Sequence, residues 1–132
     1  MSSNPILIVW GEPNSIFSEI LFKSIKIYKN KKPIVLIGSF ELLIKQIDKL
    51  KIKYNKNLIN VINEDLKNLK TNKINLLNIE YDFKKTFEKI SAKSNKYISK
   101  CFQKAFNIIS KNKISGLING PISKKNFLKK RY

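Results

Sequence analysis

The stretch Pro5-Ile6-Leu7-Ile8-Val9-Trp10-Gly11-Glu12-Pro13 decides the fold. Its first six residues form a continuous apolar run with β-branched side chains, which is typical of a strand buried on both faces of a sheet. Gly11 and Pro13 favour a turn, and we expect a helix to begin near Asn14 or Ser15, because either residue can cap it. The sequence therefore opens as a strand, a turn and a helix.

Four further segments are predicted to be strands. Residues 33–38 repeat the apolar, β-branched pattern, and weaker strands are expected over 58–62 and 74–79. The last strand is predicted over 114–119. A strand–helix–strand order implies a right-handed crossover between parallel strands. We therefore predict a single α/β unit over residues 1–132, built as a three-layer α/β/α fold with a largely parallel sheet.

The helices between these strands are predicted from apolar residues that recur with the helical period. The first follows Asn14, the second spans 40–50, and the clearest spans 94–111 with Ser91 or Ser94 as its cap. A short final helix starts at Ser123 and includes Leu128. Because that helix has barely two turns and no stop signal, we expect the fold to be incomplete at the C-terminus and the chain to be a fragment. The side chains predicted to face inward are Ile16, Phe17, Ile20, Leu21, Ile25 and Tyr28; Leu43, Ile44, Ile47 and Leu50; and Tyr97, Ile98, Cys101, Phe102, Ala105, Phe106 and Ile109.

Two turns are the candidate site. One is Gly11-Glu12-Pro13, and the other follows the strand over 114–119. Ligands of open α/β sheets bind outside the carboxyl ends of the strands, so we predict that the two turns are two walls of one crevice. The residues expected to line this crevice are Gly11, Glu12, Pro13, Asn119, Gly120, Pro121, Ser123 and Lys124.

Two of these side chains have alternative interpretations. Glu12 either holds a ligand amine or hydroxyl, orients a second loop, or simply accepts hydrogen bonds from N–H groups in its own turn. Lys124 either binds a phosphate as a point charge or is one more solvated lysine. Ser123 can cap the final helix.

Missing residue types exclude several chemistries. The chain has no histidine and one cysteine, so it has no Ser–His or Cys–His nucleophile pair, no Cys/His zinc site and no intramolecular disulfide. Neither common phosphate-loop signature is present. We predict no catalytic residue and no metal ligand within the chain, and we expect Cys101 to be a small core residue on an apolar helix face.

The charge is strongly basic, with 27 Lys and Arg residues against 9 Asp and Glu residues and a net charge of +18. This balance is compatible with nucleic-acid binding, with steering of an anionic substrate, or with an A/T-rich genome that favours Lys, Ile and Asn codons. Arg131 is the only arginine and the lysines are spread along the chain, which argues against nucleic acid. No signal peptide or membrane-spanning run is found, so we expect a cytoplasmic protein without membrane contact.

The sequence resembles the 4-hydroxythreonine-4-phosphate dehydrogenase family of pyridoxal phosphate biosynthesis. Residues 8–16 are similar to the family's Pro-Gly-Glu-Pro-x-Gly-Ile-Gly-Pro opening, and residues 94–97 with 117–124 are similar to its long helix start and its strand, Gly-Pro and Lys turn. The resemblance covers nearly all of this chain but under half of such an enzyme, at its N-terminal end. This sequence departs from the family pattern at Trp10, Ser15, Phe17, Ser18 and Ser123.

The resemblance implies an isopropylmalate-dehydrogenase-like fold and a homodimer with active sites at the subunit interface. It also implies NAD-dependent oxidation of 4-phosphooxy-L-threonine, a small phosphorylated hydroxy-amino acid, followed by decarboxylation to 3-amino-2-oxopropyl phosphate. A divalent metal (Zn, Mg or Co) held by three histidines beyond Tyr132 would assist. We therefore expect this chain alone to be inactive and to bind neither NAD nor metal. The alternatives are a lysine-rich nucleic-acid-binding module and a non-functional truncated gene product.

Overall fold

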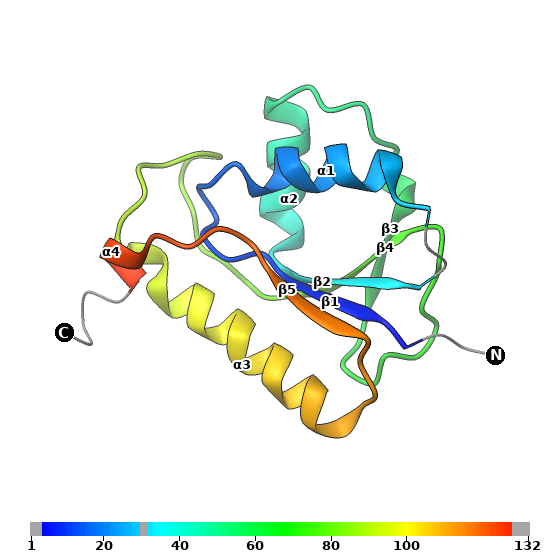
Figure 1. The fold of residues 1–132 in the computed structure, drawn as a ribbon. Helices are drawn as coiled ribbons and strands as arrows, with labels where there is room; N and C mark the ends of the chain where they lie inside the picture. Colours follow the sequence, from blue (N-terminus) through cyan, green and yellow to red (C-terminus); the bar gives the residue numbers. More distant parts are fainter. Residues whose placement is uncertain (1–3, 30–31, 128–132) are drawn as a thin grey trace.

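The computed structural model describes residues 4–29 and 32–127, and its centre is a five-stranded sheet (Figure 1). The strands are β1 (Ile6–Val9), β2 (Ile34–Gly38), β3 (Ile59–Ile62), β4 (Ile74–Asn78) and β5 (Gly116–Asn119). They lie in the order β3-β4-β2-β1-β5, and every pairing is parallel. The predicted parallel α/β sheet is confirmed.

Helices cover both faces of this sheet. The helices α1 (Phe17–Ile27) and α2 (Phe40–Lys49) lie on one face, and α3 (Asn95–Lys111) lies on the other (Figure 1). Side chains of a strand alternate between the two layers, so Ile8 packs towards α1 and α2 while Leu7 packs towards α3. The predicted three-layer arrangement is therefore confirmed. Two short 3₁₀ turns, η1 (Lys56–Leu58) and η2 (Ala92–Ser94), and the helix α4 (Lys124–Phe127) complete the described elements.

The first helix differs from the prediction in its start and its buried face. It begins at Phe17, although the Ser15 hydroxyl does accept a hydrogen bond from the Phe17 N–H at 3.2 Å. Ile16 and Ile20 are 64% and 44% exposed, whereas Phe22 is buried. The prediction placed Ile16 and Ile20 on the buried face and left out Phe22, but a helix of this length can bury only one stripe, which here includes Phe17, Leu21 and Phe22.

The other helices show smaller differences of the same kind. In α2, Leu42 is buried, whereas Leu50, which follows the end of the helix, is exposed although the sequence predicted it to face inward. In α3, Phe106 and Ile109 are exposed while Ile108 is buried. The helix α4 begins at Lys124, one residue after the predicted start at Ser123, and the part of that prediction from Leu128 onward lies outside the described residues. In the described part of the chain, every helix is too short or too polar to cross a membrane.

The topology creates a switch point between β2 and β4, which are neighbours in the sheet. The chain leaves β2 for α2 on one face, and it leaves β4 for α3 on the opposite face. Neighbouring strands whose connections diverge in this way leave a crevice at their carboxyl ends, where open α/β sheets bind ligands. The loop 79–91 that follows β4 at this point has no regular secondary structure.

Candidate functional site

The two predicted turns pack directly against each other, because β1 and β5 are adjacent strands. The Gly120 N–H donates to the Val9 carbonyl at 2.7 Å, and the Glu12 N–H donates to the Pro121 carbonyl at 2.8 Å. Gly11 has a φ of +84°, and a Cβ there would lie 2.6 Å from the Pro121 oxygen. The turns are therefore in contact instead of facing each other across a gap. The assignment of these residues to the lining of a ligand crevice stays a prediction.

Glu12 is a buried link between the first turn and the start of α3. Its side chain is 2% exposed in a strongly basic protein, and both carboxylate oxygens accept hydrogen bonds. One accepts from the Asn14 N–H at 2.8 Å, and the other accepts from the Ser94 hydroxyl at 2.9 Å. Glu12 therefore has two of its predicted roles at once. It accepts a hydrogen bond from an N–H group of its own turn, and it also orients a second segment of the chain.

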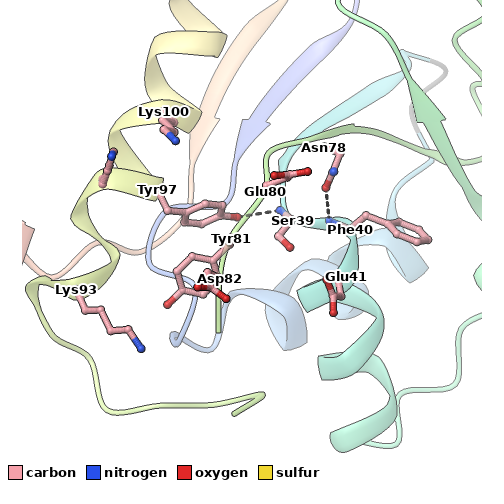
Figure 2. A pocket seen from close by; sticks show the side chains of 11 residues that line it. Ser39, Phe40, Glu41, Asn78, Glu80, Tyr81, Asp82, Lys93, Tyr97 and Lys100 are labelled. Atoms are coloured by element: carbon pink, nitrogen blue, oxygen red, sulfur yellow. Dashed lines mark hydrogen bonds between the residues drawn. The ribbon is translucent and has the colours of Figure 1, made fainter. Parts of the chain in front are cut away.

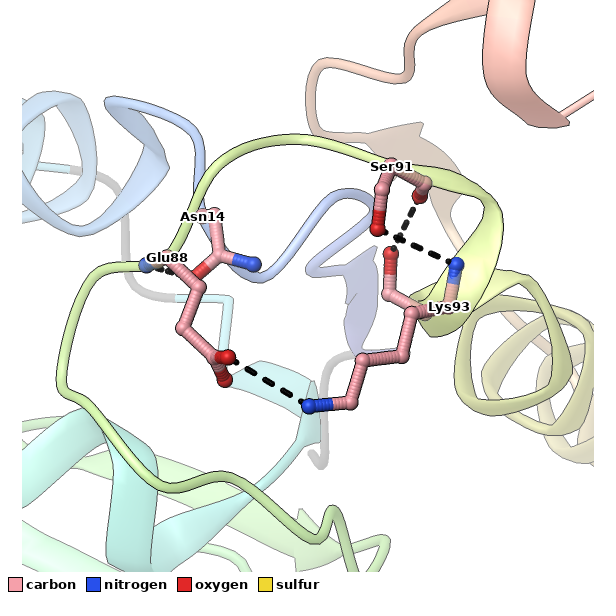
Figure 3. A network of polar contacts seen from close by, with 5 residues as sticks. Asn14, Glu88, Ser91 and Lys93 are labelled. Atoms are coloured by element: carbon pink, nitrogen blue, oxygen red, sulfur yellow. Dashed lines mark hydrogen bonds and ion pairs between the residues drawn. The ribbon is translucent and has the colours of Figure 1, made fainter.

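The same turn orders the loop that follows β4. The Asn14 side-chain oxygen accepts from the Glu88 N–H at 2.9 Å, and Glu88 forms an ion pair with Lys93 at 3.3 Å (Figure 3). On the other side, the fully buried Gln46 donates to the Pro13 carbonyl at 2.8 Å and to the Thr86 carbonyl at 3.3 Å. The first turn thereby fixes the loop 79–91 from two sides.

The remaining predicted residues lie near α4. Ser123 accepts hydrogen bonds from the backbone N–H and side-chain amide of Asn126, as its predicted capping role requires. The Asn126 carbonyl in turn accepts from the Asn95 amide at 2.8 Å, which ties α4 to the start of α3. Lys124 is exposed. Its proposed contact with a phosphate stays a prediction.

A cleft of about 800 Å³ lies at the switch point between β2 and β4 (Figure 2). Among the described residues, none of the eight predicted crevice residues lines it. Its floor is held by hydrogen bonds: the Ser39 N–H donates to the Tyr97 hydroxyl at 2.9 Å, and the Phe40 N–H donates to the Asn78 side-chain oxygen at 2.8 Å. The Ser39 hydroxyl also caps α2 by accepting from the Leu42 N–H at 3.1 Å. The cleft is thus built on two strand ends and one helix start.

Sequence reasoning missed this cleft because the order of the strands was not predicted. The signal available was the polar residue that ends each strand, Ser39 after β2 and Asn78 at the end of β4. These residues become neighbours only because β4 returns to pair with β2 after β3 has formed the edge of the sheet. A pattern confined to one segment of the chain contains no information about that pairing.

The aromatic and thiol groups beside the cleft are uncharged near neutral pH. Burial, followed by the neighbouring Cys101 thiol, raises the pKa of Tyr97 well above its usual value. Burial likewise raises the pKa of Tyr81, whose ring lies 4.6 Å from that of Tyr97. The charge of the cleft therefore comes from its lysines and carboxylates.

We expect the Cys101 thiol to react very slowly with a disulfide reagent such as Ellman's reagent at pH 8 in the native protein. The side chain is fully buried, and burial raises the pKa of its thiol from 9.0 to about 12, so the reactive thiolate is scarce. Addition of denaturant should restore rapid labelling of the single thiol. The unfolded thiol ionises near pH 9.0 while the folded thiol stays protonated to about 12, so the free energy of unfolding should fall as pH rises through that window. Rapid labelling of the native protein would place Cys101 on the surface and contradict its assignment to the core.

Across residues 4–29 and 32–127, no group of three or more His, Cys, Asp or Glu side chains is placed to hold a metal ion. The tight Gly11 turn does not offer a phosphate cradle either, because the Pro121 and Gly120 carbonyls occupy the space beside its α-carbon. The described residues therefore fit neither a metal nor a nucleotide pyrophosphate at the two turns.

The parallel sheet, the covering helices on both faces and the cleft at the switch point define a doubly wound α/β protein. Residues 29–132 match the family model of the pyridoxal phosphate biosynthetic protein PdxA. The chain belongs to the PdxA family.

Solved structures give the same fold. A 4-hydroxythreonine-4-phosphate dehydrogenase from Burkholderia phymatum matches with a TM-score of 0.72 and 17% identity over 94% of this chain and 38% of its own. A candidate 4-hydroxythreonine-4-phosphate dehydrogenase from Salmonella typhimurium matches with a TM-score of 0.74 and 17% identity over 93% of this chain and 38% of its own. At this identity the likeness concerns the fold, and this chain spans 38% of the length of either structure. A search of curated proteins finds no match to this chain.

Proposed function

We propose that this chain forms part of an NAD-dependent dehydrogenase that oxidises 4-phosphooxy-L-threonine in pyridoxal phosphate biosynthesis. The observation that carries the proposal is the match of residues 29–132 to the PdxA family. The shared fold with structures of 4-hydroxythreonine-4-phosphate dehydrogenases supports it. The proposal includes a homodimer in the cytoplasm and a divalent metal held by residues other than those described here.

The role we assign to this chain is structural support of the active site. The two packed turns fix the relative position of β1 and β5 at the carboxyl edge of the sheet. Glu12 connects this edge to the start of α3 through Ser94, and Asn95 connects α3 to α4. The described residues offer no metal site, so no catalytic step is assigned to them.

We expect the purified 132-residue chain to form no NADH from 4-phosphooxy-L-threonine, with or without added Zn²⁺, Mg²⁺ or Co²⁺. The sequence contains no histidine, and its described residues hold no group suited to a metal. NADH absorbance measured over several hours is the readout. Formation of NADH above a no-protein control would show that this chain holds a catalytic site and would contradict our assignment.

The proposal that this chain forms part of a dehydrogenase is tested by sequencing its gene. The DNA beyond the codon for Tyr132 is sequenced, and the product of any continuing frame is assayed with NAD, metal and 4-phosphooxy-L-threonine. NADH formation by that product supports the proposal. A product that folds and binds metal but forms no NADH, or the absence of any continuing frame, would overturn it.

A further inference from the structure

The strand β5 lies at one edge of the sheet, yet its sequence has the character of an internal strand. Residues 114–123 contain no charged side chain, in a chain in which 27% of the residues are charged. The two other long uncharged runs, 1–11 and 33–40, contain β1 and β2, which have a strand on either side. A continuous uncharged run of this kind is typical of a strand that is covered on both faces.

Both faces of β5 are apolar and open to solvent. Because β5 pairs in register with β1, Leu117 lies beside Leu7 on the α3 face, and Ile118 lies beside Ile8 on the face of α1 and α2. Leu7 and Ile8 are buried, whereas Leu117 and Ile118 are 39% and 54% exposed. In the described part of the chain β5 pairs with β1 alone, so the other row of its backbone N–H and C=O groups faces no strand (Figure 1). An edge of this kind is a template for a further strand.

The apolar surface continues beyond β5 onto α3. A groove of about 290 Å³ lies between α3 and the segment that follows β5, and its apolar lining residues are Phe102, Phe106, Ile122 and Phe127. Phe106 is 58% exposed. A polypeptide that extends the sheet past β5 therefore has apolar surface to cover in the α3 layer as well.

The opposite edge of the sheet, β3, is protected against a further strand. Its Asn60 amide donates to the Asn68 carbonyl at 3.1 Å, which holds the loop after β3 beside the strand. The charged residues Glu64 and Asp65 follow β3 closely. Charged residues and a covering loop are common means of closing an edge, so the two edges of this sheet differ in kind.

We propose that β5 is an internal strand of a longer PdxA-family protein, and that a strand from the part of that polypeptide outside residues 1–132 pairs with its open side. The inference rests on the proposed function only in so far as this chain forms part of a longer protein, and it requires no dehydrogenase activity. The matched structures are long enough to supply such a strand, since this chain spans 38% of either one.

A second copy of this chain fits the same edge poorly. Each copy has a net charge of +18, so two copies repel each other. A two-fold axis would also pair β5 with itself in an antiparallel arrangement, in a sheet whose described pairings are all parallel.

The test compares the 132-residue chain with the product of a reading frame that continues past Tyr132. Ile118→Cys is introduced into both proteins, and maleimide labelling is measured at each site by peptide mass spectrometry. Because the native Cys101 is fully buried, it contributes little background. We expect rapid labelling at position 118 in the 132-residue chain and at least about tenfold slower labelling in the longer product, since a buried thiol reacts slowly.

Val61→Cys on β3 is the matched control, because Val61 is 56% exposed on the opposite edge strand. Its labelling rates in the two proteins should agree within about twofold. Amide hydrogen exchange of β5 in the unsubstituted proteins is an independent measurement, and it should be slower in the longer product.

Rapid labelling at position 118 in the folded longer product, equal slowing at positions 61 and 118, or the absence of a continuing frame would overturn the proposal. Slow labelling at position 118 in a 132-residue chain that sediments as a dimer would place a second copy at this edge and would also overturn it. The readout is separate from that of the dehydrogenase. A protected β5 without NADH formation contradicts the proposed function alone, and NADH formation with rapid labelling at position 118 contradicts this inference alone.

Discussion

Replacing Gly120 with alanine should destabilise the fold by about 3 kcal/mol or more, since overpacking against backbone leaves little room for relief. A Cβ at this position would overlap the carbonyl oxygen of Trp10, and it would lie 2.8 Å from Cδ1 of Phe17. Trp10 is fully buried and Phe17 nearly so, and their rings lie 5.4 Å apart, so neither can move without disturbing the core. The strand β5 would have to separate from β1 and would lose the 2.7 Å hydrogen bond from Gly120 to Val9.

Gly116, at the start of the same strand, is the matched control. A Cβ there meets no atom of residues 4–29 or 32–127 within 4 Å, so Gly116→Ala should leave stability unchanged or raise it by up to about 1 kcal/mol through the lower chain entropy of alanine. Urea unfolding followed by circular dichroism gives both free energies. Equal effects of the two substitutions would mean that the contact between the turns does not support the sheet.

The parallel fold could be predicted because each of its central strands can be recognised from a short segment of the sequence. Residues 6–9 and 34–38 are continuous apolar runs, and a run of this kind has few alternatives to a strand buried on both faces. Which helix residues are buried was harder to predict, because α1 and α3 carry more apolar residues than they can bury. Ile20 and Phe106 therefore fit the periodic pattern and are nevertheless exposed.

The contact between the two turns and the position of the cleft were harder to predict, because both depend on which strands are neighbours in the sheet. The sequence predicted Gly11 and Gly120 as residues that line a crevice, and the structure shows both at points of close backbone approach. The sequence did not indicate that the two glycines approach each other's turns, which follows only from the pairing of β1 with β5. The cleft at β2 and β4 depends on a second such pairing, and its charged residues come from three separate segments of the chain.

The second large effect is expected at Glu12. Glu12→Ala should lower the free energy of unfolding by about 3 kcal/mol, because it removes the acceptor for two buried or half-buried donors, and hydrogen bonds to a charged group contribute about 1.5–3 kcal/mol each. The donors that lose this acceptor are the Asn14 N–H and the Ser94 hydroxyl, which keeps a longer contact with the Ser91 carbonyl at 3.4 Å. Glu19→Ala is the control, because Glu19 is exposed and pairs with Lys23 on the helix surface, so its loss should cost about 0.5 kcal/mol or less.

A double-mutant cycle with Ser94→Ala distinguishes a specific link from general loss of packing. If Glu12 stabilises the start of α3 through the Ser94 hydroxyl, removing either partner should already remove the shared hydrogen bond. The double variant should then be more stable than the sum of the single effects predicts, by about 1 kcal/mol. Strictly additive effects would show that Glu12 acts only within its own turn, through Asn14, and that the connection from the first strand to α3 carries no stabilising free energy. The coupling therefore measures how strongly the carboxyl edge of β1 is joined to α3, the helix that contributes Lys96, Tyr97 and Lys100 to the cleft.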